Sequence, residues 1–181
     1  KQQDLVDVFQ YWDGQTDDLL LTQAVIRSAV SLGCDVIEDT TFKQASLNSQ
    51  QQVCIEATHQ QQSFNVSCNI IINAAGPWID RIQNAIDFAP QGPAIDLVQG
   101  SHIEFDAPLG EGIFYVESPD DQRAVFIMPW QGGTLVGTTE KHFQGEPANC
   151  QAGSDEIEYL KKTLFHYFPD YQGQFIKAWA G

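Results

Sequence analysis

The chain has 181 residues, 43% of them hydrophobic and 18% charged, which is ordinary for a folded globular protein. Its net charge of −15 repels nucleic acid and gives no attraction to anionic lipid, so nucleic acid is excluded as a partner. No apolar run approaches the roughly 18 residues that a membrane-spanning helix needs. The four cysteines (Cys34, Cys54, Cys68 and Cys150) have no CxxC spacing, so we predict neither a metal site nor a redox pair, and we expect a reducing, cytoplasmic location.

The two ends of the chain carry no terminal signals. It begins at Lys1 without a methionine and stops at Gly181 directly after an apolar stretch. We therefore expect both ends to be interior points of a longer protein. At roughly 100–200 residues per domain, the length suits one domain or two incomplete ones.

The first part of the chain is predicted to contain a helix followed by short strands. Apolar and small residues at helical spacing predict a helix over residues 17–32, with Asp17 as its cap and Gly33 as the left-handed residue that ends it. Cys34–Asp39 is predicted to be a strand. Two further strands follow between glutamine-rich turns, one at Val53–Thr58 and one that alternates through Phe64, Val66 and Cys68.

The continuous apolar run Ile70–Ile72 is typical of a parallel strand that is covered on both faces. It leads into the small residues Ala74–Gly76, and Pro77 then begins a short helix that we predict to end at Ile86. A strand end of this kind lets the backbone come close to a flat or charged ligand at the carboxyl edge of a sheet. The alternative is a tight turn that needs glycine for backbone reasons alone.

After Pro90, Gly92 and Pro93 the pattern changes to short strands separated by tight turns. Four strands are predicted, at Ser101–Phe105, Ile113–Val116, Val125–Trp130 and Thr134–Gly137. An amphipathic helix capped by Ser154 follows over Ser154–Phe168. We therefore predict two incomplete domains. Residues 1–89 form an α/β, Rossmann-like part, and residues 90–181 form an α+β part in which this helix lies on one face of an antiparallel sheet.

The candidate catalytic residue is a histidine. Among the four histidines, His102 alone lies within a predicted strand, next to Gly100 and Ser101. An imidazole can take the proton of an alcohol while the hydride leaves elsewhere. The alternative is a half-buried histidine that is bonded to a neighbour. Thr138 and Thr139 follow another predicted strand, where they are suited either to binding an anion or simply to ending the strand.

The chain also carries an ordered set of motifs: Tyr11–Gln15 with Asp17-Asp18, Asn73–Trp78, Gly100–Ile103, Arg123–Trp130, Gly137–Thr139, Gly145–Pro147 and Ile176–Gly181. In this order and spacing they resemble the FAD-dependent glycerol-3-phosphate dehydrogenases, which belong to the glycine oxidase and D-amino-acid oxidase-like flavoproteins. Two departures remove positive charge. Leu19-Leu20 stands where the family usually has Ala-Arg, and Gln99 stands where it usually has a basic residue.

The resemblance implies a flavoenzyme that oxidises sn-glycerol 3-phosphate to dihydroxyacetone phosphate, with hydride transfer to FAD. Electrons then pass to the quinone pool, or to oxygen, and the protein contacts the inner membrane peripherally. The site residues that the resemblance implies are His102 as the catalytic base, Thr138 and Thr139 for the substrate, and Phe42, Ala75, Gly76 and Trp78 for FAD.

Two other functions stay open from the sequence. One is a related FAD-dependent oxidase of an amino acid or hydroxy acid, against which the His102 strand and the Thr138-Thr139 pair speak. The other is a non-catalytic binding or structural domain, which the neutral Gln99 favours slightly.

The first testable prediction concerns the cofactor. The glycine-rich loop that cradles the FAD pyrophosphate in this family has no counterpart in residues 1–181, and neither has the arginine expected after Gly181. We therefore expect this chain, purified by itself, to be colourless. Flavin fluorescence titration checks this, and sub-micromolar binding of FAD would contradict it.

Overall fold

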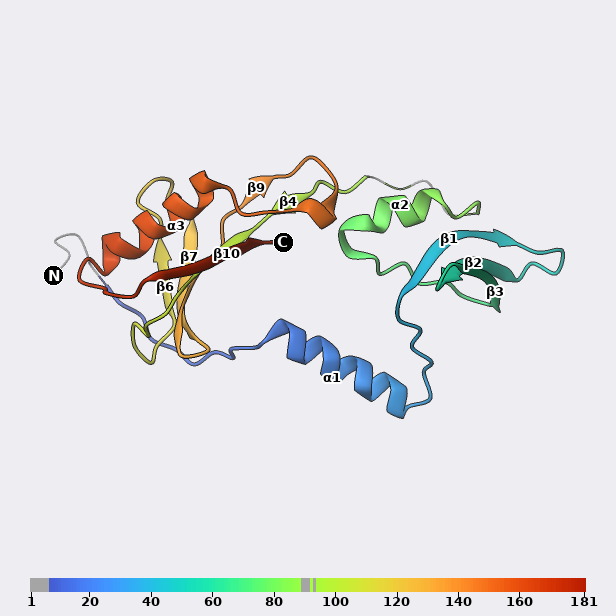
Figure 1. The fold of residues 1–181 in the computed structure, drawn as a ribbon, viewed down its shortest axis with the longest axis horizontal. Coiled ribbons are helices and arrows are strands. Elements are labelled where there is room, and N and C mark those ends of the chain that lie inside the picture. Colours follow the sequence, from blue (N-terminus) through green and yellow to red (C-terminus); the bar gives the residue numbers. More distant parts are fainter. Residues whose placement is uncertain (1–6, 89–91, 93) are drawn as a thin grey trace. The chain divides into compact units, whose positions relative to one another are not determined.

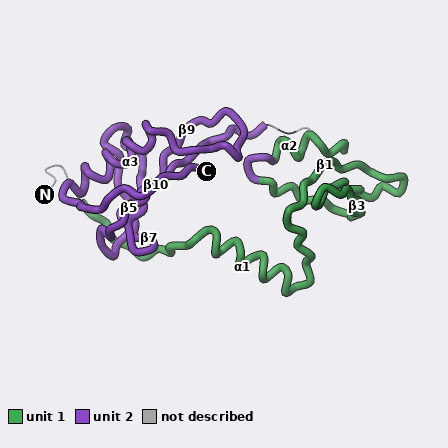
Figure 2. Tube along the Cα trace, viewed as in Figure 1, with its two compact units in different colours: residues 1–75, 79–91 green, residues 76–78, 92–181 purple. Residues whose placement is uncertain are grey.

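The computed structural model describes residues 7–88, 92 and 94–181, and the chain divides into two compact units. The first unit comprises residues 1–75 and 79–91, and the second comprises residues 76–78 and 92–181 (Figure 2). The predicted boundary between residues 89 and 90 lies outside the described residues, as do Pro90 and Pro93. The assignment of the two parts as domains therefore stays a prediction.

Helix α1 (Asp18–Ser31) of the first unit forms where the helical spacing predicts it. Asp17 Oδ1 accepts the N–H of Leu20 at 3.0 Å, and Gly33 takes a φ of +93° just after the helix, so both predicted ends are confirmed. No residue of this helix is buried, and Leu19 and Val25 are 66% and 61% exposed. The described residues therefore do not cover its apolar side chains.

The sheet of the first unit is antiparallel, with the strands β1 (Thr40–Leu47), β2 (Val53–His59) and β3 (Gln62–Cys68) in that order (Figure 1). The predicted hairpin between β2 and β3 is confirmed. It turns at Gln60 and Gln61, which both have a positive φ, as the twist of a two-residue hairpin demands. A small core forms where Ala45, Val53 and Ile86 meet.

The strand predicted at Cys34–Asp39 is wrong. The strand begins only at Thr40, because Asp39 has a φ of +51°, which interrupts an extended path. The β-branched Thr40 and Thr41 then pair with β2. The strand of this region is therefore β1, in the more polar residues that follow the predicted segment Cys34–Asp39.

The buried parallel strand predicted at Ile70–Ile72 is also wrong. Ile70 and Ile72 are 77% and 84% exposed, and residues 70–72 belong to no strand. A strand that is covered on both faces needs strands paired on either side of it, and among the described residues no strand pairs with residues 70–72. The helix after it, α2 (Ile79–Asn84), follows a 3₁₀ turn at Gly76–Trp78 and ends before Ile86. It ends there because Ile86 leaves the helix to form a parallel bridge with Ala45.

The second unit is built on a five-stranded antiparallel sheet with α3 (Ser154–Tyr167) on one face (Figure 1). The strands in spatial order are β10 (Phe175–Ala180), β5 (Ser101–Phe105), β8 (Gly133–Gly137), β7 (Ala124–Trp130) and β6 (Phe114–Glu117). A separate two-stranded ribbon pairs β4 (Val98–Gln99) with β9 (Lys141–His142), and a 3₁₀ turn, η2, spans Pro147–Asn149. The mixed α/β class and the antiparallel sheet of the second half are confirmed.

The core of this unit lies between the sheet and α3. It consists of Ile103, Phe105, Val125, Ile127 and Val136 from the strands, with Leu160 and Leu164 from the helix. The predicted apolar stripe of the helix is thus confirmed, although Gly153 rather than Ser154 occupies the cap position. One face of the sheet is therefore buried beneath α3, and the opposite face is the one that carries the candidate site.

Candidate active site

Strand β5 presents two different faces. Ile103 lies in the core beneath α3, so the alternation along the strand sends its neighbours His102 and Glu104 to the opposite side. One residue from each of the five strands is paired with the next across the sheet. This row runs in the order Trp179, His102, Gly137, Phe126 and Tyr115. We call this side of the sheet, away from α3, the His102 face.

The imidazole of His102 is half-buried and packed on both sides. It stacks on the Trp179 ring, with 5.7 Å between centroids and 16° between the ring planes. A Cβ placed on Gly137 would lie 2.1 Å from His102 Cδ2. The imidazole therefore lies across strand β8, and it has this room because residue 137 has no side chain.

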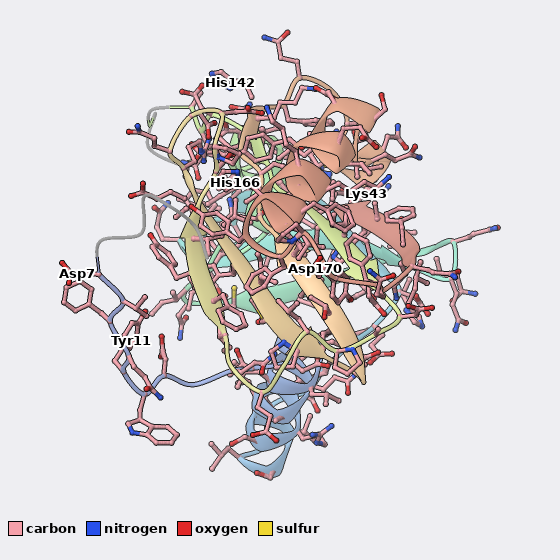
Figure 3. All side chains as sticks on the ribbon, turned by 90° about the vertical axis from the view of Figure 1, so that its left-hand side faces the viewer. Asp7, Tyr11, Lys43, His142, His166 and Asp170 are labelled. Atoms are coloured by element: carbon pink, nitrogen blue, oxygen red, sulfur yellow. The ribbon has the colours of Figure 1, made fainter. Side chains whose placement is uncertain are left out.

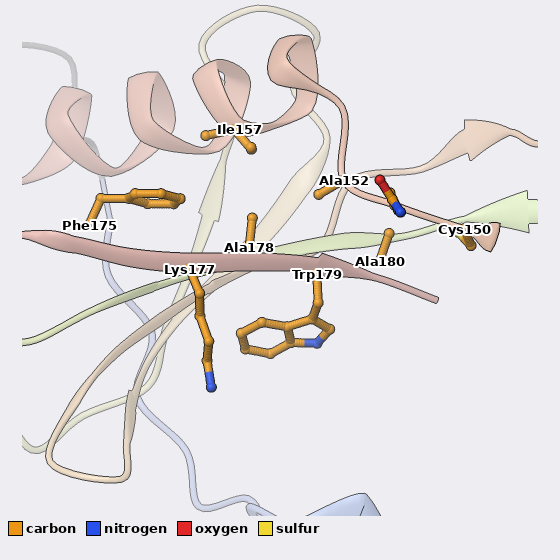
Figure 4. Close-up of a pocket in the computed structure, with 9 residues that line it drawn as sticks. Cys150, Ala152, Ile157, Phe175, Lys177, Ala178, Trp179 and Ala180 are labelled. Carbon is orange, nitrogen blue, oxygen red and sulfur yellow. The ribbon is translucent and has the colours of Figure 1, made fainter. Parts of the chain in front are cut away.

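Charged side chains stand beside His102 on the same face. Lys177 pairs in register with Glu104, and its Nζ lies 3.3 Å from Glu104 Oε2. That oxygen is nonetheless without a hydrogen bond, because the approach lacks hydrogen-bond geometry, so the pair is held by charge alone. The Nζ also lies 5.3 Å from the Trp179 ring centroid. Lys177 and Trp179 project together from β10 on the side away from α3 (Figure 4).

The two threonines at the end of β8 point to different faces. Thr138 is exposed, and a Cβ placed on Gly100 would lie 2.5 Å from its Oγ1. Because Gly100 shares its face with His102 by alternation, the Thr138 hydroxyl lies on the His102 face. Thr139 is buried on the α3 side, where its Oγ1 donates to Glu156 Oε1 at 2.6 Å. The structure thus brings His102 and Thr138 together, whereas the Thr139 hydroxyl is engaged inside the unit.

A buried carboxylate, Glu156 on α3, lies directly behind the His102 strand and is 5% exposed. It accepts hydrogen bonds from Gln99 Nε2 at 2.6 Å, Ser101 Oγ at 2.8 Å, Thr139 Oγ1 at 2.6 Å and Gly153 N at 3.0 Å. Burial raises the pKa of the Glu156 carboxyl, but the hydrogen bonds from Thr139, Gly153 and Ser101 and the charge of Lys141 outweigh it and hold that pKa below its usual value. The carboxylate is therefore ionised at neutral pH.

A hollow of about 430 Å³ runs along β10, lined on the helix side by Cys150, Ala152 and Ile157 (Figure 4). It reaches Lys177 and Trp179, but its other walls belong to the outer edge of β10 and the start of α3. Since it opens at the edge of the sheet and His102 is not among its lining residues, we place the candidate active site on the His102 face.

The other histidines give no second candidate. His142 and His166 lie at the surface (Figure 3), and His59 Nδ1 lies 3.2 Å from Thr40 Oγ1 at the start of β1. Within residues 7–88, 92 and 94–181, no three His, Cys, Asp or Glu side chains converge to hold a metal ion. In the same residues, no helix is long and apolar enough to cross a membrane.

The turn that was predicted to contact FAD fits a flat cofactor through its backbone. Asn73 holds it from inside, since Asn73 Oδ1 accepts the Ala75 N–H at 3.3 Å and Asn73 Nδ2 donates to the Ile79 carbonyl at 2.9 Å. Gly76 has a φ of +52°, and a Cβ placed on it would meet nothing within 4 Å. The turn is therefore fixed on one side and open at Gly76, as close approach of a ligand requires.

The remaining two candidates for FAD have protein partners. The Trp78 indole N–H donates to Glu146 Oε1 at 2.7 Å, and Phe42 packs against the small core of the first unit. Contact of Phe42 with a cofactor is thus left to its backbone. All four assignments to FAD stay predictions.

Sequence reasoning missed Glu104, Glu156, Lys177 and Trp179 as parts of the site. Side chains alternate between the two faces along a strand, so Glu104 is expected on the same face as His102. By the same rule Lys177 is expected on the same face as Trp179. The pairing of β10 with β5, which joins these two sets, cannot be seen in either strand alone. Glu156 lay in the first turn of a predicted helix, where an acidic residue is explained by the helix dipole.

Comparison with known proteins places this geometry in a family. The model of the family "DAO: FAD dependent oxidoreductase" matches residues 2–181. The aerobic glycerol-3-phosphate dehydrogenase of Staphylococcus saprophyticus is 28% identical over 94% of this chain and 32% of its own length. The enzymes of the same name from Staphylococcus epidermidis and Staphylococcus aureus are 27% and 26% identical over the same shares. The chain thus spans about a third of the length of these relatives.

Solved structures agree in fold. The glycerol-3-phosphate dehydrogenase from Bacillus halodurans complexed with FAD matches with a TM-score of 0.83 and 24% identity, over 92% of this chain and 35% of that one. The L-proline dehydrogenase from P. horikoshii matches with a TM-score of 0.65 and 12% identity, over 90% of this chain and 42% of that one. At these identities the matches show the fold.

The second testable prediction follows from the lowered pKa of Glu156. A carboxyl with a folded-state pKa below its unfolded one stabilises the protein at pH values above the unfolded pKa, and this stability is lost as the pH falls through the folded-state pKa. Glu156→Gln leaves buried donors unpaired and should lower the free energy of unfolding by about 1–3 kcal/mol near neutral pH. The deficit should shrink as the pH falls below about 4.3.

Urea unfolding of this chain across that pH range measures the effect. The matched control is Glu158→Gln, which removes an exposed carboxylate, paired with Lys161, from the same helix. A deficit for Glu156→Gln that is independent of pH, or no larger than that of the control, would refute the account.

Proposed function

Because the chain belongs to the family of FAD-dependent oxidoreductases, we propose that it is part of an enzyme that oxidises sn-glycerol 3-phosphate to dihydroxyacetone phosphate. The observation that carries the proposal is the open His102 face, on which an imidazole, a hydroxyl and an ammonium group stand together opposite a buried core. The names of the curated relatives support the substrate.

Bound FAD supplies the hydride acceptor. The reaction also needs a group that takes the proton of the substrate hydroxyl, and His102 is suited to this because an imidazole exchanges protons near neutral pH. Stacking on Trp179 and the close approach to Gly137 restrict its ring to one orientation. A base that is already fixed in its reactive orientation does not have to be ordered during the reaction.

The substrate would be held by polar groups on the same face. The Thr138 hydroxyl lies next to Gly100, two residues before His102. It donates to the Thr139 carbonyl at 3.1 Å, and its oxygen can accept a hydrogen bond from a hydroxyl of the substrate. Lys177 is the basic residue that faces this side in the described part of the second unit.

The other basic residues of that part lie on the opposite side. Arg123 and Lys141 line a hollow with Glu156 on the α3 side, and Lys161 and Lys162 lie on α3 itself. We therefore assign the phosphate-facing positive charge on this chain to Lys177.

The FAD-binding part of the proposal rests on the turn at Ala75 and Gly76, with Phe42 and Trp78 as further contacts. Gly76 offers open space at a positive φ, and Asn73 fixes the backbone around it. We also propose the quinone pool as the electron acceptor, with contact at the inner membrane surface. The net charge of −15 gives this chain no electrostatic attraction to anionic lipid, so that contact requires other parts of the protein.

The third testable prediction concerns His102. In the complete protein that contains this chain, His102→Ala should lower turnover of sn-glycerol 3-phosphate by roughly two to four orders of magnitude, because the base is lost. The flavin absorption spectrum should stay unchanged. His166→Ala, an exposed histidine on α3, is the matched control.

Steady-state kinetics with sn-glycerol 3-phosphate, an amino acid and a 2-hydroxy acid separates the candidate functions. Turnover of the first substrate alone, abolished by His102→Ala, supports the proposal. A change of less than about threefold in both turnover and KM returns His102 to a structural role. Turnover of an amino acid or a hydroxy acid instead would assign the protein to an oxidase.

A further inference from the structure

The strands that carry His102 and Thr138 are fixed from the opposite side of the sheet. Ser101, the residue before His102, donates its hydroxyl to Glu156 Oε1 at 2.8 Å. Thr139, the residue after Thr138, donates to the same oxygen at 2.6 Å, and its Oγ1 also accepts the Ser101 N–H at 2.8 Å. One carboxylate oxygen therefore joins the start of β5 to the end of β8, directly behind the two side chains of the proposed site.

The second oxygen of Glu156 ties this junction to the chain around it. Glu156 Oε2 accepts from Gln99 Nε2 at 2.6 Å and from the N–H of Gly153, which caps α3, at 3.0 Å. Gln99 Nε2 also donates to the Gln151 carbonyl at 2.9 Å. The donors Gln99 and Gly153 are buried and half-buried respectively, so losing their acceptor leaves N–H groups that water cannot easily reach.

We propose that Glu156 is a positioning residue that sets the placement of His102 and Thr138 through Ser101 and Thr139. The inference rests on the proposed function, since it assigns Glu156 an effect on the same reaction. Glu156 touches neither substrate nor cofactor in this account. It bonds to Ser101 and Thr139, which are the chain neighbours of His102 and Thr138, and so acts on these two side chains through the backbone.

The chemistry of the network requires a carboxylate at this position. Four donors converge on the side chain, and only an ionised carboxyl group offers two oxygens that accept without donating. A glutamine of the same shape would keep one accepting oxygen and turn an NH₂ group toward the donors of Gln99 and Gly153. Glu156→Gln thus tests the hydrogen bonding with little change in packing.

The same network explains Gln99, which stands where the resemblance leads one to expect a basic residue. Gln99 is 6% exposed and bonds to Glu156 on the α3 side, so it does not face the substrate. The Cys150 thiol donates to its Oε1 at 3.2 Å. The side chain of residue 99 therefore contacts Glu156 inside the unit and not a substrate on the His102 face. Its neutrality removes no positive charge from that face.

The test compares turnover in variants of the complete protein that contains this chain. Glu156→Gln should lower kcat by roughly 10–100-fold with the flavin spectrum unchanged, because displacements of about 1 Å in a catalytic group cost this much. Leu164→Ala is the matched control, since it weakens the core beneath α3 but leaves the hydrogen bonds of Glu156 in place. Both are assayed at a temperature where circular dichroism shows them folded.

Two milder variants guard against loss of folding. Ser101→Ala and Thr139→Val each remove one donor and leave the carboxylate in place, and each should lower kcat in part. If Glu156 acts through Thr139, the double variant Glu156→Gln/Thr139→Val should be little worse than Glu156→Gln alone.

The outcomes separate this inference from the proposed function. Loss of kcat in Glu156→Gln, beyond that of Leu164→Ala and non-additive with Thr139→Val, supports it. Equal kcat in Glu156→Gln and Leu164→Ala overturns the positioning role of Glu156. If His102→Ala is inactive in the same assay, the proposed function is still supported. An active His102→Ala variant overturns both.

Discussion

The buried carboxylate of Glu156 holds together the three elements on which the candidate site depends. Its two oxygens accept hydrogen bonds from the start of β5, from the end of β8 and from the N-terminus of α3. Each donor is buried or half-buried. If the carboxylate were removed, these donors would therefore lose their hydrogen-bond acceptor in a place that water does not easily reach. Ile103 and Val136 of the same two strands pack in one apolar core with Leu160 and Leu164 of α3. The polar network and the core therefore stabilise the same junction.

This arrangement gives the two faces of the sheet separate roles. The face beneath α3 is filled by the core and by Glu156, and it fixes the backbone. The His102 face is lightly covered, with Trp179, Phe126 and Tyr115 exposed by 36%, 37% and 59%. Gly137 leaves a gap in this aromatic row at the point where the His102 ring lies across the strand. The side chains of the proposed site then lie on one face, while the opposite face supplies the rigidity that the proposed base needs.

Local patterns in the sequence predicted the second unit well, because its strands and helix each carry their own signal. Val125–Trp130 and Thr134–Gly137 alternate and are joined by a glycine turn, and the α3 stripe is periodic, so each element could be recognised alone. The failures have physical causes. Asp39 adopts a positive φ that no periodicity reveals, and Ile70–Ile72 has the composition of a buried strand without described neighbours to bury it. His102 could be selected from its strand, but its contacts with Trp179 and the charges at Glu104 and Lys177 depend on the pairing of β5 with β10, which no local pattern specifies.

In the proposed enzyme, substrate oxidation takes place on the face of the sheet opposite α3, beside His102. A crystal structure of the complete protein with FAD and a non-reacting analogue of sn-glycerol 3-phosphate tests it most directly. We expect the analogue hydroxyl at about 2.6–3.2 Å from a ring nitrogen of His102, with the flavin ring on the same face. An analogue bound in the hollow along the edge of β10, or a flavin ring on the α3 side of the sheet, would contradict it.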